Sequence, residues 1–165
     1  MRDYSAGAAY GDYFVSEETL FPAGHANGRL PAKTQIFALR LNDQPKAYPL
    51  SILFAEKLVH DTVGSQPILL VANEGNVNVH GYSYELEYIS YSAGGAVRAY
   101  ERGARQFVLS DDPAVLLDEQ GERWSMTEEA LFGPAGERLE RLGGHLAFWF
   151  GWSAAHPNTA LYEAP

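Results

Sequence analysis

The sequence contains no cysteine, and this absence removes a whole group of chemistries. Without thiols the chain forms no disulfide, no zinc–thiolate or iron–sulfur centre, and no cysteine-linked haem. Thiolate nucleophiles are excluded for the same reason. The cellular compartment stays open, because a protein without thiols tolerates oxidising and reducing surroundings equally well.

Basic residues are scarce as well. The chain has 12 Lys and Arg against 21 Asp and Glu, which gives a formal net charge of −9 at pH 7. Proteins bind nucleic acid phosphates through clustered basic side chains, so this balance argues against nucleic acid as a partner. The closest basic group in the sequence is Arg98, Arg102 and Arg105.

Long apolar runs are also missing. The longest lies around Leu146 to Trp152, whereas a membrane-spanning helix needs about 20 apolar residues. No positively charged stretch followed by an apolar core opens the sequence, so we expect no signal peptide. A location outside the cytoplasm stays open, because a leader can be removed. The sequence also has no Gly-Lys-Ser or Gly-x-Gly-x-x-Gly phosphate loop, and no Gly-x-Ser-x-Gly nucleophile elbow.

The residues that are present predict a well-packed protein. Hydrophobic residues make up 46% and aromatic residues 13% of the 165 positions, which is enough for one domain with a core. Residues 1–33 are interrupted by glycine and proline but carry several aromatic side chains. We therefore expect residues 1–33 to form an irregular arm packed on a single α+β domain of residues 34–165.

Alternating or continuous apolar stretches predict the strands. Turns are expected at residues 42–44, 62–65 and 73–76, and residues 67–72 are expected to form a central strand. Two hairpins are predicted, one joining 96–101 to 106–109 and one joining 115–117 to 123–125. The remaining expected strands are residues 35–41, 45–48, 77–80, 82–91 and 160–162.

Three helices are expected. The first begins at Pro49, shows an apolar stripe at helical spacing, and ends near His60. The second follows a capping-box pattern at Ser125 and runs through Phe132. The third covers residues 146–155. Together these elements predict an α+β fold with a mainly antiparallel, strongly bent sheet or partial barrel and two or three short helices.

Five blocks in a fixed order carry a resemblance to a known family. The chain resembles the bacterial and archaeal domain-of-unknown-function family 3179, from about residue 13 onward. The resemblance implies a fold but no assigned activity. The blocks are Lys46-Ala47-Tyr48-Pro49-Leu50, His60-Asp61-Thr62-Val63-Gly64 with Pro67, residues 95–102, residues 117–124, and residues 149–159.

Two departures from the family pattern bear on function. Many members carry a Cys-Pro-Leu-Cys-Gly-like stretch before the strand that corresponds to residues 96–102, and such a pair can hold a metal or do redox chemistry. Residues 91–95 of this chain, Tyr-Ser-Ala-Gly-Gly, contain no sulfur. Residues 73–90 form an additional segment between two strands that lie closer together in typical members.

The aromatic residues predict a binding surface. Tyr82, Tyr84 and Tyr88 share one face of a predicted strand, and Trp149 and Trp152 belong to the last helix. We expect one side of that helix to pack in the core. The remaining aromatic side chains would contact the N-terminal arm, a partner chain or a flat ligand. We therefore predict a non-catalytic domain that binds a protein or a small molecule, with oligomer formation left open. Replacing Tyr84 and Tyr88 by Ala is expected to abolish binding and leave the fold intact.

A histidine-based metal site is the alternative from another class. Imidazoles with a carboxylate can hold a single transition metal, and the candidate ligands are His60, Asp61, His80 and His156. No two histidines are spaced as His-x-His or His-x-x-x-His, which would place both on one face of a strand or a helix. The site would therefore be assembled from distant segments. The competing interpretations place His60 at a helix C-terminus and His156 as a helix cap. No other cofactor is expected.

Overall fold

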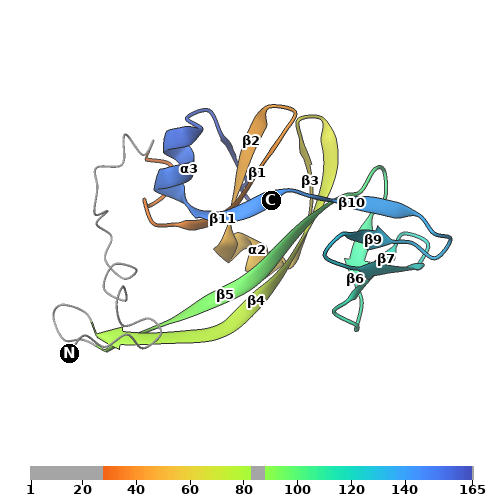
Figure 1. Ribbon diagram of the computed structural model, residues 1–165, viewed down its shortest axis with the longest axis horizontal. Helices are drawn as coiled ribbons and strands as arrows, with labels where there is room; N and C mark the ends of the chain where they lie inside the picture. Colours follow the sequence, from red (N-terminus) through yellow and green to blue (C-terminus); the bar gives the residue numbers. More distant parts are fainter. Residues whose placement is uncertain (1–27, 83–87, 165) are drawn as a thin grey trace.

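The computed structural model describes residues 28–82 and 88–164, and the side chains of residues 28–74 and 95–164. Most of the expected 1–33 arm lies outside these ranges. The described chain is mostly antiparallel β-structure with two short helices (Figure 1), and neither helix is long or apolar enough to span a bilayer.

The elements are β1 (Gln35–Leu41), β2 (Gln44–Pro49), α2 (Leu50–Glu56), β3 (Leu58–Val63), β4 (Gln66–Tyr82), β5 (Tyr88–Glu101), β6 (Phe107–Leu109), β7 (Val115–Asp118), β8 (Arg123–Met126), β9 (Ala130–Phe132), β10 (Arg138–Leu142), β11 (Gly144–Phe148), α3 (Trp149–Ala155) and β12 (Ala160–Leu161).

The strands form two sheets. The four-stranded sheet has the order β11-β1-β2-β12, and the eight-stranded sheet has the order β3-β4-β5-β10-β9-β8-β7-β6. β12 runs parallel to β2, and the other pairs are antiparallel. The expectation of a mainly antiparallel architecture is confirmed, although the protein has fewer helical residues than an even α+β mixture.

β4 is buried on both faces between residues 68 and 72. Ile68 and Leu70 pack against the four-stranded sheet, while Leu69 and Val71 pack against β6 to β9. A continuous apolar run is typical of a strand covered on both sides, so the prediction of a central strand at 67–72 is confirmed. The residues of β1 divide in the same way between α3 and the eight-stranded sheet.

The eight-stranded sheet curls until its first and last strands meet. Nε2 of His60 in β3 accepts a hydrogen bond of 3.0 Å from the backbone N–H of Phe107 in β6. Trp124 fills the enclosed space, with its ring 5.5 Å from that of Phe107 in an edge-on arrangement. The curvature agrees with the expected partial barrel.

β4 and β5 form one long ribbon that extends away from the rest of the molecule (Figure 1). Their pairing runs from Ile68↔Glu101 to Tyr82↔Tyr88, with a register shift between Glu74 and Val77. The turn predicted at residues 73–76 is therefore wrong, because these residues form an irregularity within one strand. Residues 73–82 and 88–90, which belong to the segment expected to be additional, form the outer part of this ribbon.

The helix predicted from Pro49 to His60 is shorter than expected. α2 ends at Glu56, and Lys57 adopts a positive φ of 62° that stops the helix. Residues 58–63 then alternate between the two faces of β3, so His60 lies on a strand and not at a helix C-terminus. Val59 and Val63 favour the strand because β-branched side chains pack well on a sheet.

The helix predicted at 125–132 is wrong. Ser125 belongs to β8, and residues 130–132 pair back onto it as β9. The cap in this segment is Thr127, whose Oγ1 accepts hydrogen bonds from the backbone N–H groups of Glu129 and Ala130 and so closes a turn. The helix predicted at 146–155 begins only at Trp149, because residues 144–148 pair with β1 as β11.

One of the two predicted hairpins is present. β7 and β8 pair as expected around residues 119–122, where the buried Asp118 accepts hydrogen bonds from the Trp124 indole and from two turn amides. The hairpin predicted between 96–101 and 106–109 is wrong, because β5 pairs with β10 and β6 pairs with β7. Arg102 holds the connecting loop by donating to the carbonyls of Ile68 and Arg105.

Candidate functional site

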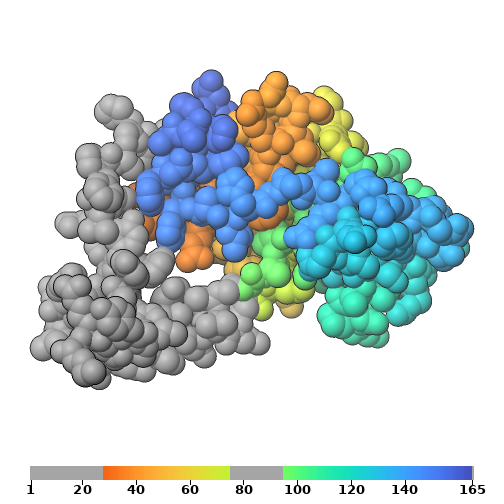
Figure 2. All heavy atoms as spheres, in the orientation of Figure 1, coloured from red at the N-terminus to blue at the C-terminus, as the bar shows by residue number. Residues whose placement is uncertain are grey.

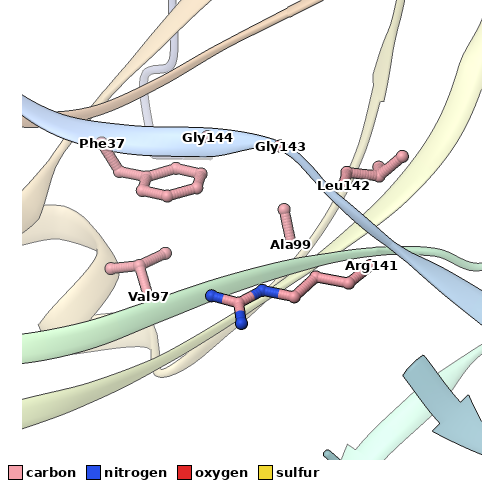
Figure 3. A pocket seen from close by; sticks show the side chains of 7 residues that line it. All are labelled: Phe37, Val97, Ala99, Arg141, Leu142, Gly143 and Gly144. Carbon is pink, nitrogen blue, oxygen red and sulfur yellow. The ribbon is translucent and has the colours of Figure 1, made fainter. Parts of the chain in front are cut away.

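A hollow of about 270 Å³ lies between the two sheets, where the chain passes from β10 directly into β11. In the space-filling view these two strands form a continuous band across the molecule (Figure 2). The side chains of Phe37, Val97 and Ala99 reach the hollow from β1 and β5, and the Arg141 guanidinium extends along β5 (Figure 3). We call this space the inter-sheet hollow; its lining residues are Phe37, Val97, Ala99, Arg141, Leu142, Gly143 and Gly144.

The hollow exists because β10 leaves β5 early. The two strands pair only at Arg141↔Tyr100 and Leu142↔Ala99 before the chain turns to the other sheet. Gly144 then pairs with β1, and a Cβ at this position would overlap the Phe37 ring. The close approach of the backbone to that ring therefore requires glycine at 144.

A second hollow of about 310 Å³ lies beside β8 and is lined in part by Arg98 and Glu128. Nε of Arg98 donates to Oε1 of Glu128 at 2.7 Å, and the guanidinium of Arg141 forms an ion pair with Oε2 of the same carboxylate. We call these three residues the Arg–Glu–Arg link. It joins the two hollows, because Arg141 lines one while Arg98 and Glu128 line the other.

The β8–β9 turn fixes the backbone of the link. The hydroxyl of Tyr100 donates to the Thr127 carbonyl at 2.5 Å, and the Thr127 N–H donates to the Ala130 carbonyl. Arg141 also donates to the Glu128 carbonyl at 3.0 Å. The pKa of Glu128 is lowered, and the main cause is its hydrogen bond to Arg98. The Glu128 carboxylate is therefore ionised at neutral pH.

A second polar cluster joins β2, β3 and the C-terminal segment. Oδ2 of Asp61 lies 2.6 Å from Nζ of Lys46 and accepts a 2.6 Å hydrogen bond from the Tyr48 hydroxyl. The Lys46 ammonium also lies over the rings of Tyr48 and Tyr162, whose centroids are 5.3 Å apart. This cluster connects the two sheets, and the two charged side chains are each only 17% exposed.

The tyrosines of this cluster are held in their neutral form. Burial, followed by the hydrogen bond to Asp61, raises the pKa of Tyr48 well above its ordinary value. Burial and the hydrogen bond to Glu56 raise the pKa of Tyr162 to about 12. Neither hydroxyl is therefore suited to act as a base near neutral pH, and a structural role explains the cluster.

The predicted metal ligands are not brought together. His60 and Asp61 are neighbours on β3, so their side chains point to opposite faces, toward Phe107 of β6 and toward Lys46 and Tyr48 of β2. His156 caps α3 and its ring lies against Trp152. The side chain of His80 lies outside the described residues. Within the described part of the chain, no three His, Asp or Glu residues form a metal-binding group.

The predicted aromatic surface separates into two parts. Trp149 and Trp152 are 0% and 6% exposed and pack against the four-stranded sheet, which supports the core-packing interpretation for both. Tyr82 and Tyr88 are paired at the outer end of the ribbon, but their side chains, and all of Tyr84, lie outside the described residues. Binding by these three tyrosines stays a prediction.

Sequence reasoning did not single out the residues of the inter-sheet hollow and the link. Arg98 lies in one of the family blocks and in the closest basic group, which was the available signal. Its partner Glu128 lies 30 positions away, and Arg141 a further 13. Only the folding of β10 against β5 and the turn after β8 makes them neighbours.

Comparison with known proteins gives a family and no activity. No curated protein and no solved structure matches the chain. The family model described as "Protein of unknown function (DUF3179)" matches residues 1–159. This match confirms the resemblance carried by the five sequence blocks: the chain belongs to the DUF3179 family.

Proposed function

We propose that this domain is a non-catalytic binding module whose ligand occupies the inter-sheet hollow. The observation that carries the proposal is a hollow whose wall combines apolar side chains, the backbone of Gly143 and Gly144, and a single cationic group. Phe37, Val97 and Ala99 belong to the core and form a largely buried apolar floor, and the exposed Arg141 provides the charge. Ligand sites typically combine an apolar lining with a few polar groups that orient the ligand. At about 270 Å³ the hollow fits a small molecule.

The lining favours binding over catalysis. The described residues around the hollow include no histidine, carboxylate, hydroxyl or amine. Arginine stays protonated in proteins, so Arg141 can bind and orient a ligand but does not exchange protons with it. The carboxylate paired with Arg141, that of Glu128, is also engaged by Arg98.

The proposal is tested by filling the hollow. Ala99→Leu places a larger side chain in the space, and Ala55→Leu makes the same change on the exposed surface of α2. Benzoate and benzamide, each an aromatic ring with one polar group, serve as probes in amide NMR titrations. We expect the amide signals of residues 97–99 and 141–144 to shift in the wild type and in Ala55→Leu.

In Ala99→Leu these shifts should be lost, provided that circular dichroism shows a folded protein. Binding of either probe to Ala99→Leu with wild-type affinity would contradict the proposal. So would the absence of shifts at these amides in the wild type with both probes.

A further inference from the structure

We infer that the ligand of the inter-sheet hollow is an organic anion, a carboxylate on an apolar body, and that Glu128 competes with it for the arginines. This inference rests on the proposed function and names its ligand class. A ligand that places its apolar body against Phe37 would have its carboxylate beside the guanidinium of Arg141. Arginine binds carboxylates well because its planar fork donates two parallel hydrogen bonds.

The charges of the Arg–Glu–Arg link are unequal. Two guanidinium groups share one carboxylate, so the link carries a surplus positive charge. This surplus occurs in a chain with a formal net charge of −9. The other described ion pairs nearby are one to one, as between Arg138 and Glu140. A second carboxylate would balance the charge of the link.

The Glu128 carboxylate can turn away while the backbone of its turn stays in place. Its side chain is 63% exposed, so it can turn into water. Arg141 keeps its hydrogen bond to the Glu128 carbonyl, which belongs to the backbone and not to the side chain. The turn itself is held by Tyr100 and Thr127. Arg141 therefore stays held by the backbone, and an entering carboxylate would replace one that the protein already supplies.

The test compares an anionic with a neutral probe. Benzoate and benzamide share a ring and differ in charge, and both are titrated by amide NMR at one ionic strength, because salt screens exposed ion pairs. Glu128→Gln removes the competing charge and keeps the side chain's size. We expect it to bind benzoate about three- to tenfold more tightly than the wild type. Its affinity for benzamide should be unchanged.

Matched controls come from the neighbouring pair on β10. Glu140→Gln removes a carboxylate that pairs with Arg138, and should leave benzoate binding as it is in the wild type. Arg141→Gln should weaken benzoate binding about tenfold or more, since a hydrogen bond to a charged group is lost. Arg138→Gln should not weaken it. Circular dichroism checks that each variant is folded.

The outcomes separate the two proposals. Equal binding of benzoate and benzamide, with both lost in Ala99→Leu, would keep the hollow as a binding site and overturn the anion assignment. Unchanged or weaker benzoate binding in folded Glu128→Gln would also overturn it. Failure of both probes to bind the hollow in the wild type would instead remove the proposed function.

Discussion

Asp118 shows how a charged block of this sequence serves the structure. The residue is 7% exposed, and its carboxylate accepts hydrogen bonds from the indole of Trp124 and from the amides of Gln120 and Glu122. Burial alone would raise the pKa of Asp118, but these hydrogen bonds outweigh it and lower the pKa. The charge of this block therefore stabilises a hairpin, and the ionic chemistry open to a ligand lies elsewhere.

His60 makes stability depend on pH. Loss of water around the ring, together with the positive charge of Arg102, lowers the pKa of His60 below its ordinary value. As pH falls below about 6.5, the unfolded chain takes up a proton that the folded protein resists. We expect the free energy of unfolding to fall as pH decreases through this window, because the protonated ring can no longer accept the Phe107 N–H.

His60→Gln keeps an acceptor for that N–H but does not titrate. Urea unfolding of the variant between pH 8 and pH 5 should therefore show a smaller loss of stability than the wild type. Parallel pH profiles for the two proteins would show that His60 does not carry the dependence.

For single residues, the sequence predicted which side chains are buried better than it predicted which residues contact one another. The aromatic side chains expected in the core at Trp149 and Trp152 are buried. The hydrogen bond between His60 and Phe107 joins residues 47 positions apart, and no local pattern predicts such a pair. The same holds for the link, whose members come from β5, β10 and a turn.

Among the elements, strands were easier to predict than helices. The run 67–72 and the 115–125 hairpin carry clear apolar patterns and turn residues, and both are present. The segments 58–60 and 125–132 carry helix signals that tertiary pairing overrides, since β3 pairs with β4 and β9 pairs with both β8 and β10. Local propensity is a weak guide where an edge of a sheet is available.

The β3–β4 turn allows a test of close packing between elements. Gly64 and Gly103 have nearly equal positive φ values of 55° and 57°. A Cβ at Gly64 would overlap the Leu41 carbonyl oxygen, whereas a Cβ at Gly103 meets nothing within 4 Å. Gly103→Ala should cost about 1 kcal/mol for its backbone conformation, and Gly64→Ala about 1–3 kcal/mol more for the overlap.

Chemical denaturation of the two variants measures this difference directly, because the backbone cost is common to both. Equal losses of stability would show that the β1–β2 and β3–β4 turns move apart readily. The side chain of Asn42 donates a 2.8 Å hydrogen bond to the Gly64 carbonyl. This bond holds the two turns together, so we expect unequal losses.

The whole molecule should unfold as one unit. The two sheets share a core cluster that includes Phe37, Leu53 and Leu70, and the chain crosses between them at Gly143. Separating the sheets would expose this cluster, so neither is expected to persist alone.

The three tryptophans report on the two sheets separately. Trp124 lies inside the eight-stranded sheet, and Trp149 and Trp152 lie against the four-stranded sheet. In Trp124→Phe and in the double variant Trp149→Phe/Trp152→Phe, the remaining fluorescence should give the same denaturation midpoint as circular dichroism of that variant. Two separate midpoints within one variant would show that the sheets unfold independently.

The overall architecture was predictable only in part. A mainly antiparallel, bent sheet follows from the many short strands and turn residues. The order of strands does not, because β5 pairs with β10 across 36 intervening residues and the pattern of each strand fits several neighbours. The inter-sheet hollow depends on that order, so it could not be predicted either.

Gly143, where the chain crosses between the sheets, is suited to site-specific labelling. A Cβ at Gly143 would meet no atom within 4 Å beyond its chain neighbours, and the sequence contains no thiol. A cysteine introduced there would accept a maleimide dye at one defined position on the rim, so a single fluorescent label could signal occupancy without any background reaction.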